Sequence, residues 1–291
     1  MNASIPLSKA SAFYELTKPG ITRLVLVSTA AGFYLAGGAS SSLLTFVNAL
    51  VATALVASGT NALNQWFERD ADAHMRRTAQ RPLPSGRVSS REAMFFAWGI
   101  SLIGLVYLAV FVNMLTAFVV GFTLGSYVFV YTPLKRKTWI STLIGAVPGA
   151  LPIIAGWTAT GRPLNAAAWA LFGIMFLWQL PHFFALAWIY RDDYRNAGFR
   201  MLTVVDSTGT RAAWQALLYT AALIPISLLP TFFGLTGTVY LVGAVILGLA
   251  FLMPTILMLL RGPNEKFAWR TFAASIAYLP MLLLLMVIDK T

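Results

Sequence analysis

The sequence contains no cysteine and only two histidines, His74 and His182. These absences exclude a disulfide framework, a thiolate metal site and a metal centre built from a cluster of histidines. Charged residues are also scarce, at 11% of 291 residues, whereas hydrophobic residues make up 58%. Together with a mean hydropathy of +0.73, this composition excludes an ordinary soluble domain and predicts a polytopic helical membrane protein.

Acidic residues are the scarcer charged class, with 10 Asp and Glu against 21 Lys and Arg. The basic residues lie in short loops between long apolar runs, so we expect a lipid bilayer and no nucleic acid as partner. Residues 1–20 are polar. They lack the pattern of a cleaved signal peptide, in which a basic segment is followed by an apolar segment and a cleavage site of small residues. We expect the whole chain, residues 1–291, to form a single integral membrane domain.

Nine apolar runs approach the roughly 20 residues that a membrane-spanning helix needs. They are predicted at Ile21–Ala36, Leu43–Phe67, Arg91–Val112, Leu115–Tyr131, Trp139–Thr160, Asn165–Tyr190, Ala212–Phe233, Gly237–Leu260 and Trp269–Ile288. The loops after the second and sixth runs are long and mix acids with bases, whereas those after the fourth and eighth are mainly basic. This alternation predicts an all-α fold of two four-helix pseudo-repeats plus a ninth helix.

The basic residues are distributed very unevenly between the two sides of these nine spans. If the N-terminus is cytoplasmic, all of the 21 Lys and Arg except Arg162 and Lys290 lie inside. The positive-inside rule predicts this asymmetry. We therefore expect a multi-pass protein of the bacterial cytoplasmic (inner) membrane, with its N-terminus and its long polar loops in the cytoplasm.

The most unusual polar stretch begins in the C-terminal end of the second run and covers residues 61–84. Asn64, Glu68 and Asp72 are four residues apart, so on a helix they form one stripe about two turns long. Their oxygens suit Mg²⁺, which commonly binds one or two carboxylates together with substrate phosphate oxygens. Arginines follow the stripe and are suited to the remaining phosphate charge. The stretch predicts half of a Mg²⁺-diphosphate site at the membrane surface.

A second acidic stretch, Tyr190–Leu202, is predicted to continue the sixth span as the first stretch continues the second. It contains Asp192 and Asp193. An Asp-Asp pair alone is also typical of a solvated loop. Because the first stretch is also present, we favour the interpretation that the two acidic stretches clamp a pair of Mg²⁺ ions and one diphosphate.

Four motifs in this order resemble the UbiA-type family of intramembrane prenyltransferases. They are Asn64-xxx-Glu68-xxx-Asp72 with Met75–Leu83, Tyr131–Thr138, Trp178–Phe184 and Asp193–Leu202. Within the family they are most similar to the members that farnesylate haem. The resemblance is strong from residue 18 to residue 202, and it departs from the family's usual pattern at Glu68, where most members have Asp.

The resemblance implies Mg²⁺-dependent transfer of a farnesyl group from farnesyl diphosphate to a vinyl group of haem b. It also implies contact with haem A synthase or with terminal oxidase assembly. The implied catalytic residues are Asn64, Glu68, Asp72 and Asp193. The implied Mg²⁺ ligands are Asn64, Glu68, Asp72, Asp192 and Asp193. The implied substrate contacts are Asn61, Arg77, Arg81, Lys135, Arg136 and His182.

Two alternatives stay open at this point. A related prenyltransferase acting on an aromatic or quinone precursor has the same site chemistry. A membrane transporter or a non-catalytic oxidase assembly factor also combines pseudo-repeats with intramembrane polar residues.

His182 follows Pro181 inside the sixth span, where an ionisable residue is a functional candidate by default. Imidazole is a usual axial ligand of haem iron, which favours contact with the haem substrate. The alternative is a hydrogen-bonded packing residue.

Overall fold

The structure is a computed structural model that describes residues 8–37 and 42–291. Within these ranges nine helices are long and apolar enough to cross a membrane, which confirms the predicted number. They are α2 (Pro19–Gly37), α3 (Leu43–Asp72), α4 (Ser90–Phe111), the continuous run of α5 (Met114–Gly125), η2 (Ser126–Tyr131) and α6 (Thr132–Leu134), α7 (Ser141–Ala159), α8 (Ala166–Ile189), α11 (Thr210–Phe232), α12 (Thr238–Leu260) and α13 (Glu265–Ile288).

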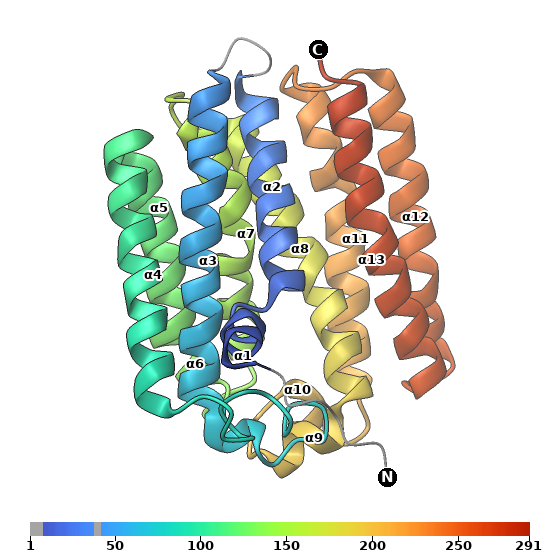
Figure 1. The fold of residues 1–291 in the computed structure, drawn as a ribbon. Coiled ribbons are helices and arrows are strands. Elements are labelled where there is room, and N and C mark those ends of the chain that lie inside the picture. Colours follow the sequence, from blue (N-terminus) through green and yellow to red (C-terminus); the bar gives the residue numbers. More distant parts are fainter. Residues whose placement is uncertain (1–7, 38–41) are drawn as a thin grey trace.

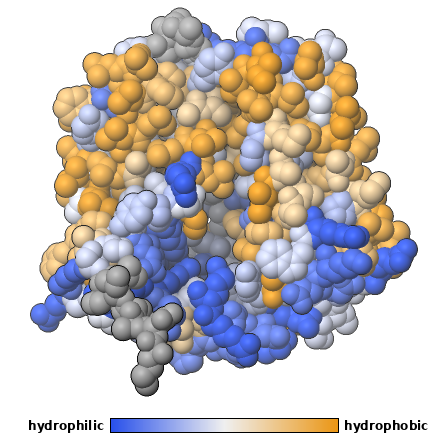
Figure 2. All heavy atoms as spheres, turned by 45° about the vertical axis from the view of Figure 1, so that its right-hand side comes forward, coloured by the Kyte–Doolittle hydropathy of each residue, from blue (hydrophilic) through white to orange (hydrophobic). Residues whose placement is uncertain are grey.

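The spans stand side by side, and the polar connections gather at one end of the bundle (Figure 1). Three short helices lie at this lower end: α1 (Lys9–Leu16), α9 (Arg191–Asn196) and α10 (Leu202–Val205). The C-terminus lies at the opposite end, as an odd number of spans requires. Figure 2 shows hydrophobic residues over the upper part of the visible face and hydrophilic residues along its lower edge. This division is the one expected for a protein embedded in lipid.

Side-chain caps fix where several spans begin, because the first backbone N–H groups of a helix have no partner within it. The α4 helix begins with a capping box in which Ser89 and Glu92 satisfy each other's backbone N–H groups. Four other spans have a single capping side chain at their start, namely Ser42, Asn113, Asn165 and Asn264. The polar residues between apolar runs therefore determine the helix starts.

The helices α7 and α8 form the centre of the bundle. The α2 helix packs on α7, α7 packs on α8, and α13 packs on α8 from the other side. The α3 helix pairs with α4, and its counterpart in the second half, α8, pairs with α11. This correspondence agrees with the predicted pair of four-helix repeats followed by a ninth helix.

Two spans depart from the prediction in ways that bear on the site. The α3 helix continues to Asp72 instead of ending at Phe67, because its last polar side chains are buried against neighbouring segments. The fourth span changes from α-helix to π-helix at Ser126, and a local π-helical turn of this kind is often found at functional sites.

The second acidic stretch does not continue α8, so that expectation was wrong. Tyr190 leaves the helical conformation (φ −106°, ψ 24°), and the separate helix α9 begins at Arg191. Gly198, with φ +72°, then turns the chain, and the following Phe199 is buried, 3% exposed. Burial of this aromatic ring fixes the path of the loop.

Glycines bring α2 and α7 into close contact. A Cβ atom on Gly32 would lie 2.0 Å from the carbonyl oxygen of Ile153, and one on Gly156 would lie 1.9 Å from that of Thr29. Small residues at a helix crossing allow such an approach in membranes, where van der Waals packing drives association. The contact fixes one wall of the central cavity described below.

We expect Gly156→Ala to destabilise the protein by about 1–3 kcal/mol, because the added methyl group overpacks this crossing. The measurement is the unfolding temperature of the purified protein in detergent. Gly99→Ala on α4 is the matched control, since a Cβ atom there meets nothing within 4 Å and alanine favours a helix. Equal unfolding temperatures for the two variants would contradict the close packing.

Candidate active site

The predicted stripe lies on one buried face at the end of α3. Asn64, Glu68 and Asp72 are only 1%, 6% and 0% exposed. A buried carboxylate is costly unless it is paired with a cation or hydrogen-bonded. The positions of the neighbouring cations therefore decide whether this arrangement is stable.

Both carboxylates are paired with a cation from another segment. The Nζ atom of Lys135, just after α6, lies 2.8 Å from Oε1 of Glu68. The Nη1 atom of Arg81, in the loop after α3, lies 2.8 Å from both carboxylate oxygens of Asp72. Burial opposes the charge on Lys135, but the Glu68 carboxylate raises its pKa well above the ordinary value. Four predicted site residues are thus joined in two ion pairs.

The third member of the stripe is also held by a cation, which the sequence analysis did not single out. The Nζ atom of Lys18 donates a hydrogen bond of 2.7 Å to Oδ1 of Asn64. The amide of Asn64 in turn donates to Oγ1 of Thr132 at 3.2 Å. Burial and the nearby guanidinium of Arg81 lower the pKa of Lys18 to about 7. In the sequence, Lys18 is one of many basic residues that flank spans, so only its position next to Pro19 sets it apart.

Two further amides of α3 hold the turn that carries Lys18. The Nδ2 atom of Asn61 donates to the carbonyl oxygen of Thr17 at 3.1 Å and to Oγ1 of Thr22 at 3.2 Å. The Nε2 atom of Gln65 donates to the carbonyl oxygen of Leu16 at 3.0 Å. Asn61, predicted as a substrate contact, therefore anchors the α1–α2 turn in this structure. Gln65 is a second anchor that the sequence analysis did not identify.

The loop after α8 lies against the loop after α3. An apolar cluster joins them, formed by Ala71, Met75, Ala187, Phe199 and Met201. The guanidinium of Arg77 lies 4.9 Å from the ring centre of Tyr190, and the backbone N–H of Arg200 donates to the carbonyl of Lys135 at 2.8 Å. These contacts bring the two polar stretches together at one end of the bundle, as the sequence predicted.

The two aspartates of the second stretch are not gathered with the α3 stripe. Asp192 is 72% exposed at its side chain and pairs with Arg195 at 2.9 Å. Asp193 is half-buried in the first turn of α9. In residues 8–37 and 42–291 no three acidic or histidine side chains form a metal-binding group. Arg136, a predicted substrate contact, is exposed.

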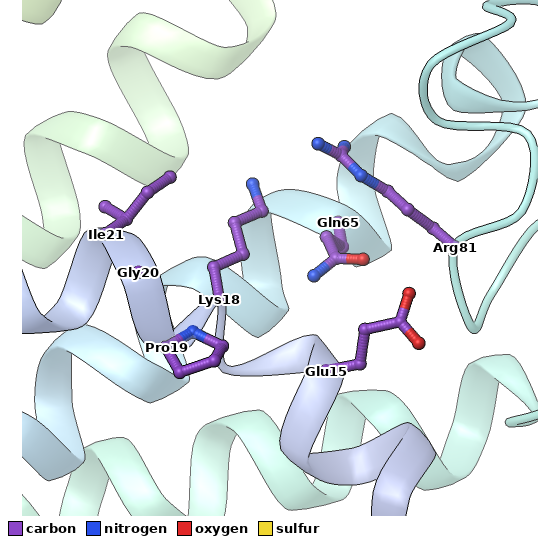
Figure 3. Close-up of a pocket in the computed structure, with 7 residues that line it drawn as sticks. All are labelled: Glu15, Lys18, Pro19, Gly20, Ile21, Gln65 and Arg81. Carbon is purple, nitrogen blue, oxygen red and sulfur yellow. The ribbon is translucent and has the colours of Figure 1, made fainter. Parts of the chain in front are cut away.

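An apolar cavity of about 340 Å³ lies inside the bundle between α2, α3, α5, η2, α7 and α8, and its lining includes Asn61, one turn of α3 before Asn64. This volume lies within the range of about 300–1,000 Å³ found for ligand pockets. The polar residues in its lining include Asn61, Tyr127, Tyr131 and His182. A second hollow of about 280 Å³ opens beside Lys18, Gln65 and Arg81 (Figure 3). Ile21 lines both hollows.

His182 lies on the cavity wall at the contact between α8 and α13. Its Nδ1 atom is 2.8 Å from Oγ of Ser275, and its ring centre is 4.8 Å from that of Phe272. The side chain therefore has a hydrogen-bond partner and also faces the cavity. Both interpretations of His182 given above agree with this position.

The donor atoms at the end of α3 fit a hard divalent cation. Two carboxylates and one amide oxygen lie on the same buried face, and Mg²⁺ prefers oxygen ligands of this kind. The lysines and the arginine beside them fit the oxygens of a phosphorylated ligand. The fold and the site together define a class: helical membrane proteins with an acidic and cationic site at the end of an apolar cavity.

The chain belongs to the UbiA prenyltransferase family, whose family model matches residues 25–279. It is 45% identical over 287 residues to the protoheme IX farnesyltransferase of Solibacter usitatus, covering 96% of this chain and 98% of that protein. It is 42% identical over 296 residues to the protoheme IX farnesyltransferase of Myxococcus xanthus, covering 100% and 99%. Family membership decides in favour of a prenyltransferase over a transporter or an assembly factor.

Solved structures show the same fold. A digeranylgeranylglyceryl phosphate synthase is similar with a TM-score of 0.81 at 18% identity, covering 97% of this chain and 98% of that one. A UbiA homologue from Archaeoglobus fulgidus, bound to DMAPP and Mg²⁺, has a TM-score of 0.71 at 18% identity, covering 94% and 98%. The predicted UbiA-like, all-α architecture is confirmed.

We expect Lys135→Met to destabilise the protein by roughly 3–5 kcal/mol, because it leaves the buried Glu68 carboxylate without its cation. The double variant Glu68→Gln, Lys135→Met should regain most of this stability, since neither charge remains. Chemical unfolding in detergent measures both. If the single and double variants unfold at the same denaturant concentration, the pair does not compensate the buried charge.

Proposed function

We propose that this protein transfers the farnesyl group of farnesyl diphosphate to a vinyl group of haem b, in a Mg²⁺-dependent reaction. The observation that carries the proposal is the buried stripe of Asn64, Glu68 and Asp72, paired with cations at the end of an apolar cavity. A diphosphate with a long hydrocarbon chain matches this combination of a charged end and an apolar interior. The names of the 40–45% identical relatives supply the haem acceptor.

We propose that Mg²⁺ is held by Asn64, Glu68 and Asp72. The second half of the site is supplied by Asp192 and Asp193 after α9 reorients. The bound cation would neutralise the negative charge that develops on the departing diphosphate. Asp192 is exposed and its ion pairs are with Arg191 and Arg195 of its own short helix, so its carboxylate can exchange these partners for a cation at small cost.

The cations of the site have a second task in this proposal. Arg81 and Lys135 pair with the carboxylates, and we propose that they also donate hydrogen bonds to the diphosphate oxygens. Charge-assisted hydrogen bonds to phosphate favour this contact. Arg77, beside Tyr190, and the exposed Arg136 reach the same diphosphate from the rim.

In the proposed reaction the bond between C1 of the farnesyl group and oxygen breaks, and the diphosphate leaves with the electron pair. The vinyl group of haem b attacks C1, and water adds to the resulting cation with loss of a proton. The rings of Tyr127 and Tyr131 face the cavity beside Asn61 and are suited to a passing allylic cation. His182, on the cavity wall, is proposed to contact the haem.

We expect Glu68→Gln and Asp72→Asn to lower Mg²⁺-dependent farnesyl transfer by about 10²–10³-fold, the usual loss for one electrostatic group acting in the transition state. The measurement is mass spectrometry of haem extracted after incubation with farnesyl diphosphate and Mg²⁺. Asp70→Asn is the matched control, because Asp70 lies on the same helix with a side chain that is 74% exposed. It should transfer farnesyl at the wild-type rate.

The same assay separates the two prenyl acceptors. Farnesylated haem, with no product from an aromatic acid or quinone precursor, supports the proposal. The reverse result would replace haem by an aromatic acceptor, and full activity of Asp72→Asn would remove the α3 stripe from the site.

We further propose that the protein lies in the bacterial cytoplasmic membrane with its N-terminus and site on the cytoplasmic side. The chain has no cysteine, so a single introduced cysteine gives a clean label. We expect Lys137→Cys to be protected from an impermeant maleimide in intact spheroplasts and Arg162→Cys to react, because the two exposed positions lie at opposite ends of the bundle. The reverse pattern would invert the topology.

A further inference from the structure

The imidazole of His182 is joined to the ninth span by a hydrogen bond on one side of its ring. Its Nδ1 atom lies 2.8 Å from Oγ of Ser275 on α13. The same hydroxyl donates to the carbonyl oxygen of Phe272, one turn earlier on α13, at 2.6 Å. A carbonyl oxygen can only accept, so the single hydrogen of the hydroxyl is committed to Phe272. The Oγ atom of Ser275 must therefore accept the hydrogen bond from His182.

This arrangement determines which nitrogen of His182 carries the proton. A neutral imidazole has one N–H donor and one nitrogen with a lone pair. Because Nδ1 donates to Ser275, the lone pair belongs to Nε2. Among the described residues, none forms a hydrogen bond with Nε2, and His182 lines the central cavity. The ring therefore offers this lone pair to a ligand in the cavity.

Aromatic neighbours restrict the orientation of the ring. Its centre lies 4.8 Å from that of Phe272 and 5.5 Å from that of Trp178, one turn earlier on α8. The indole N–H of Trp178 donates to the carbonyl oxygen of Ser275 at 2.7 Å, so α8 and α13 are hydrogen-bonded twice at this level. Trp178 and Ser275 are both buried. The position of the imidazole thus depends on the packing of the ninth helix against α8 (Figure 1).

The chemistry of the cavity wall limits what the lone pair can bind. Within the part of the chain that the structure describes, no carboxylate, guanidinium or ammonium group lines the cavity. A neutral imidazole is stable at such a wall, whereas an unpaired charge is costly there. Neutral imidazole is a usual axial ligand of haem iron, and metal-binding histidines generally donate their other N–H to an oxygen atom. His182, with its donor bond to Ser275, has both features.

We propose that Nε2 of His182 ligates the iron of the haem acceptor, and that Ser275 is a positioning residue that fixes the tautomer required for this bond. The inference rests on the proposed function and extends it from contact with haem to a bond between nitrogen and iron. The lone pair of Nε2 fills an axial position of the iron, so the step needs no oxidant or reductant. The hydrogen bond from Nδ1 to Ser275 makes the imidazole a stronger donor to the metal. The ninth helix, which lies outside the two repeats, thereby helps to hold the acceptor.

Binding of haem b to the full-length protein in nanodiscs, without farnesyl diphosphate, tests the inference apart from turnover. Absorption titration gives the affinity, and resonance Raman spectra of the ferrous complex show the iron–imidazole stretching vibration. We expect this vibration in the wild type and its loss in His182→Ala. Added imidazole should restore it in His182→Ala, because the free base can enter the space that the side chain leaves.

We expect Ser275→Ala to bind haem about 10–100-fold more weakly, the usual loss when a metal ligand loses its hydrogen-bond partner. Its iron–imidazole vibration should move to lower frequency, because Nδ1 no longer has an acceptor. Ser275→Thr should recover both properties, since a threonine hydroxyl on a helix can also bond the carbonyl three residues earlier. Ser227→Ala on α11 is the matched control and should bind haem as the wild type does. Ser227 is equally buried, and its hydroxyl donates at 2.7 Å to the carbonyl of Ile224, three residues earlier.

The Raman spectrum reports only folded protein that holds haem, so a loss of stability alone does not shift the vibration. A wild-type haem complex without the iron–imidazole vibration overturns the ligation by His182. Equal frequencies in Ser275→Ala and the wild type overturn the role of Ser275. If the vibration and its shift are found but haem is not farnesylated, the ligation is supported and the proposed function fails.

Discussion

The structure depends on the burial of two carboxylates and an amide at the end of α3. Glu68 and Asp72 are almost fully buried, and a buried carboxylate is stable only with a partner. Lys135 and Arg81 supply the partners from two different connections, and Lys18 supplies a third contact at Asn64. Because these partners come from different connections, their contacts bring the connections together at one end of the bundle.

The rest of the fold positions this site. Close packing of α2 on α7 at Gly32 and Gly156 forms one wall of an apolar cavity, and α3 and α8 carry the polar loops on corresponding ends of two repeats. The apolar cluster around Phe199 holds those loops together. Electrostatic interactions with a ligand are stronger at a charged site beside an apolar cavity than in bulk water. The same arrangement suits ionisation of a diphosphate next to a hydrocarbon chain.

Much of this was predictable because membrane helices leave a strong signal in a sequence. The nine apolar runs and the loop charges predict the fold, and the four-residue spacing of the stripe predicts one half of the candidate site. The interruption after Ile189 was not predictable, since it depends on burial of Phe199 against residues of another loop. The π-helical turn at Ser126 likewise has no clear signal in the local sequence.

The sequence by itself determined the number of spans, the distribution of charge and the face of α3 on which Asn64, Glu68 and Asp72 lie. These properties follow from local periodicity and from the cost of placing polar groups in lipid. Only the tertiary structure decided which cation meets which oxygen. Lys18 and Asn64 are 46 residues apart and Lys135 lies beyond two further spans, so their contacts depend on how the helices pack and on no pattern within a segment. For the same reason, the position of Asp192 depends on the path of its own loop. The likeness between the two acidic stretches did not predict that position.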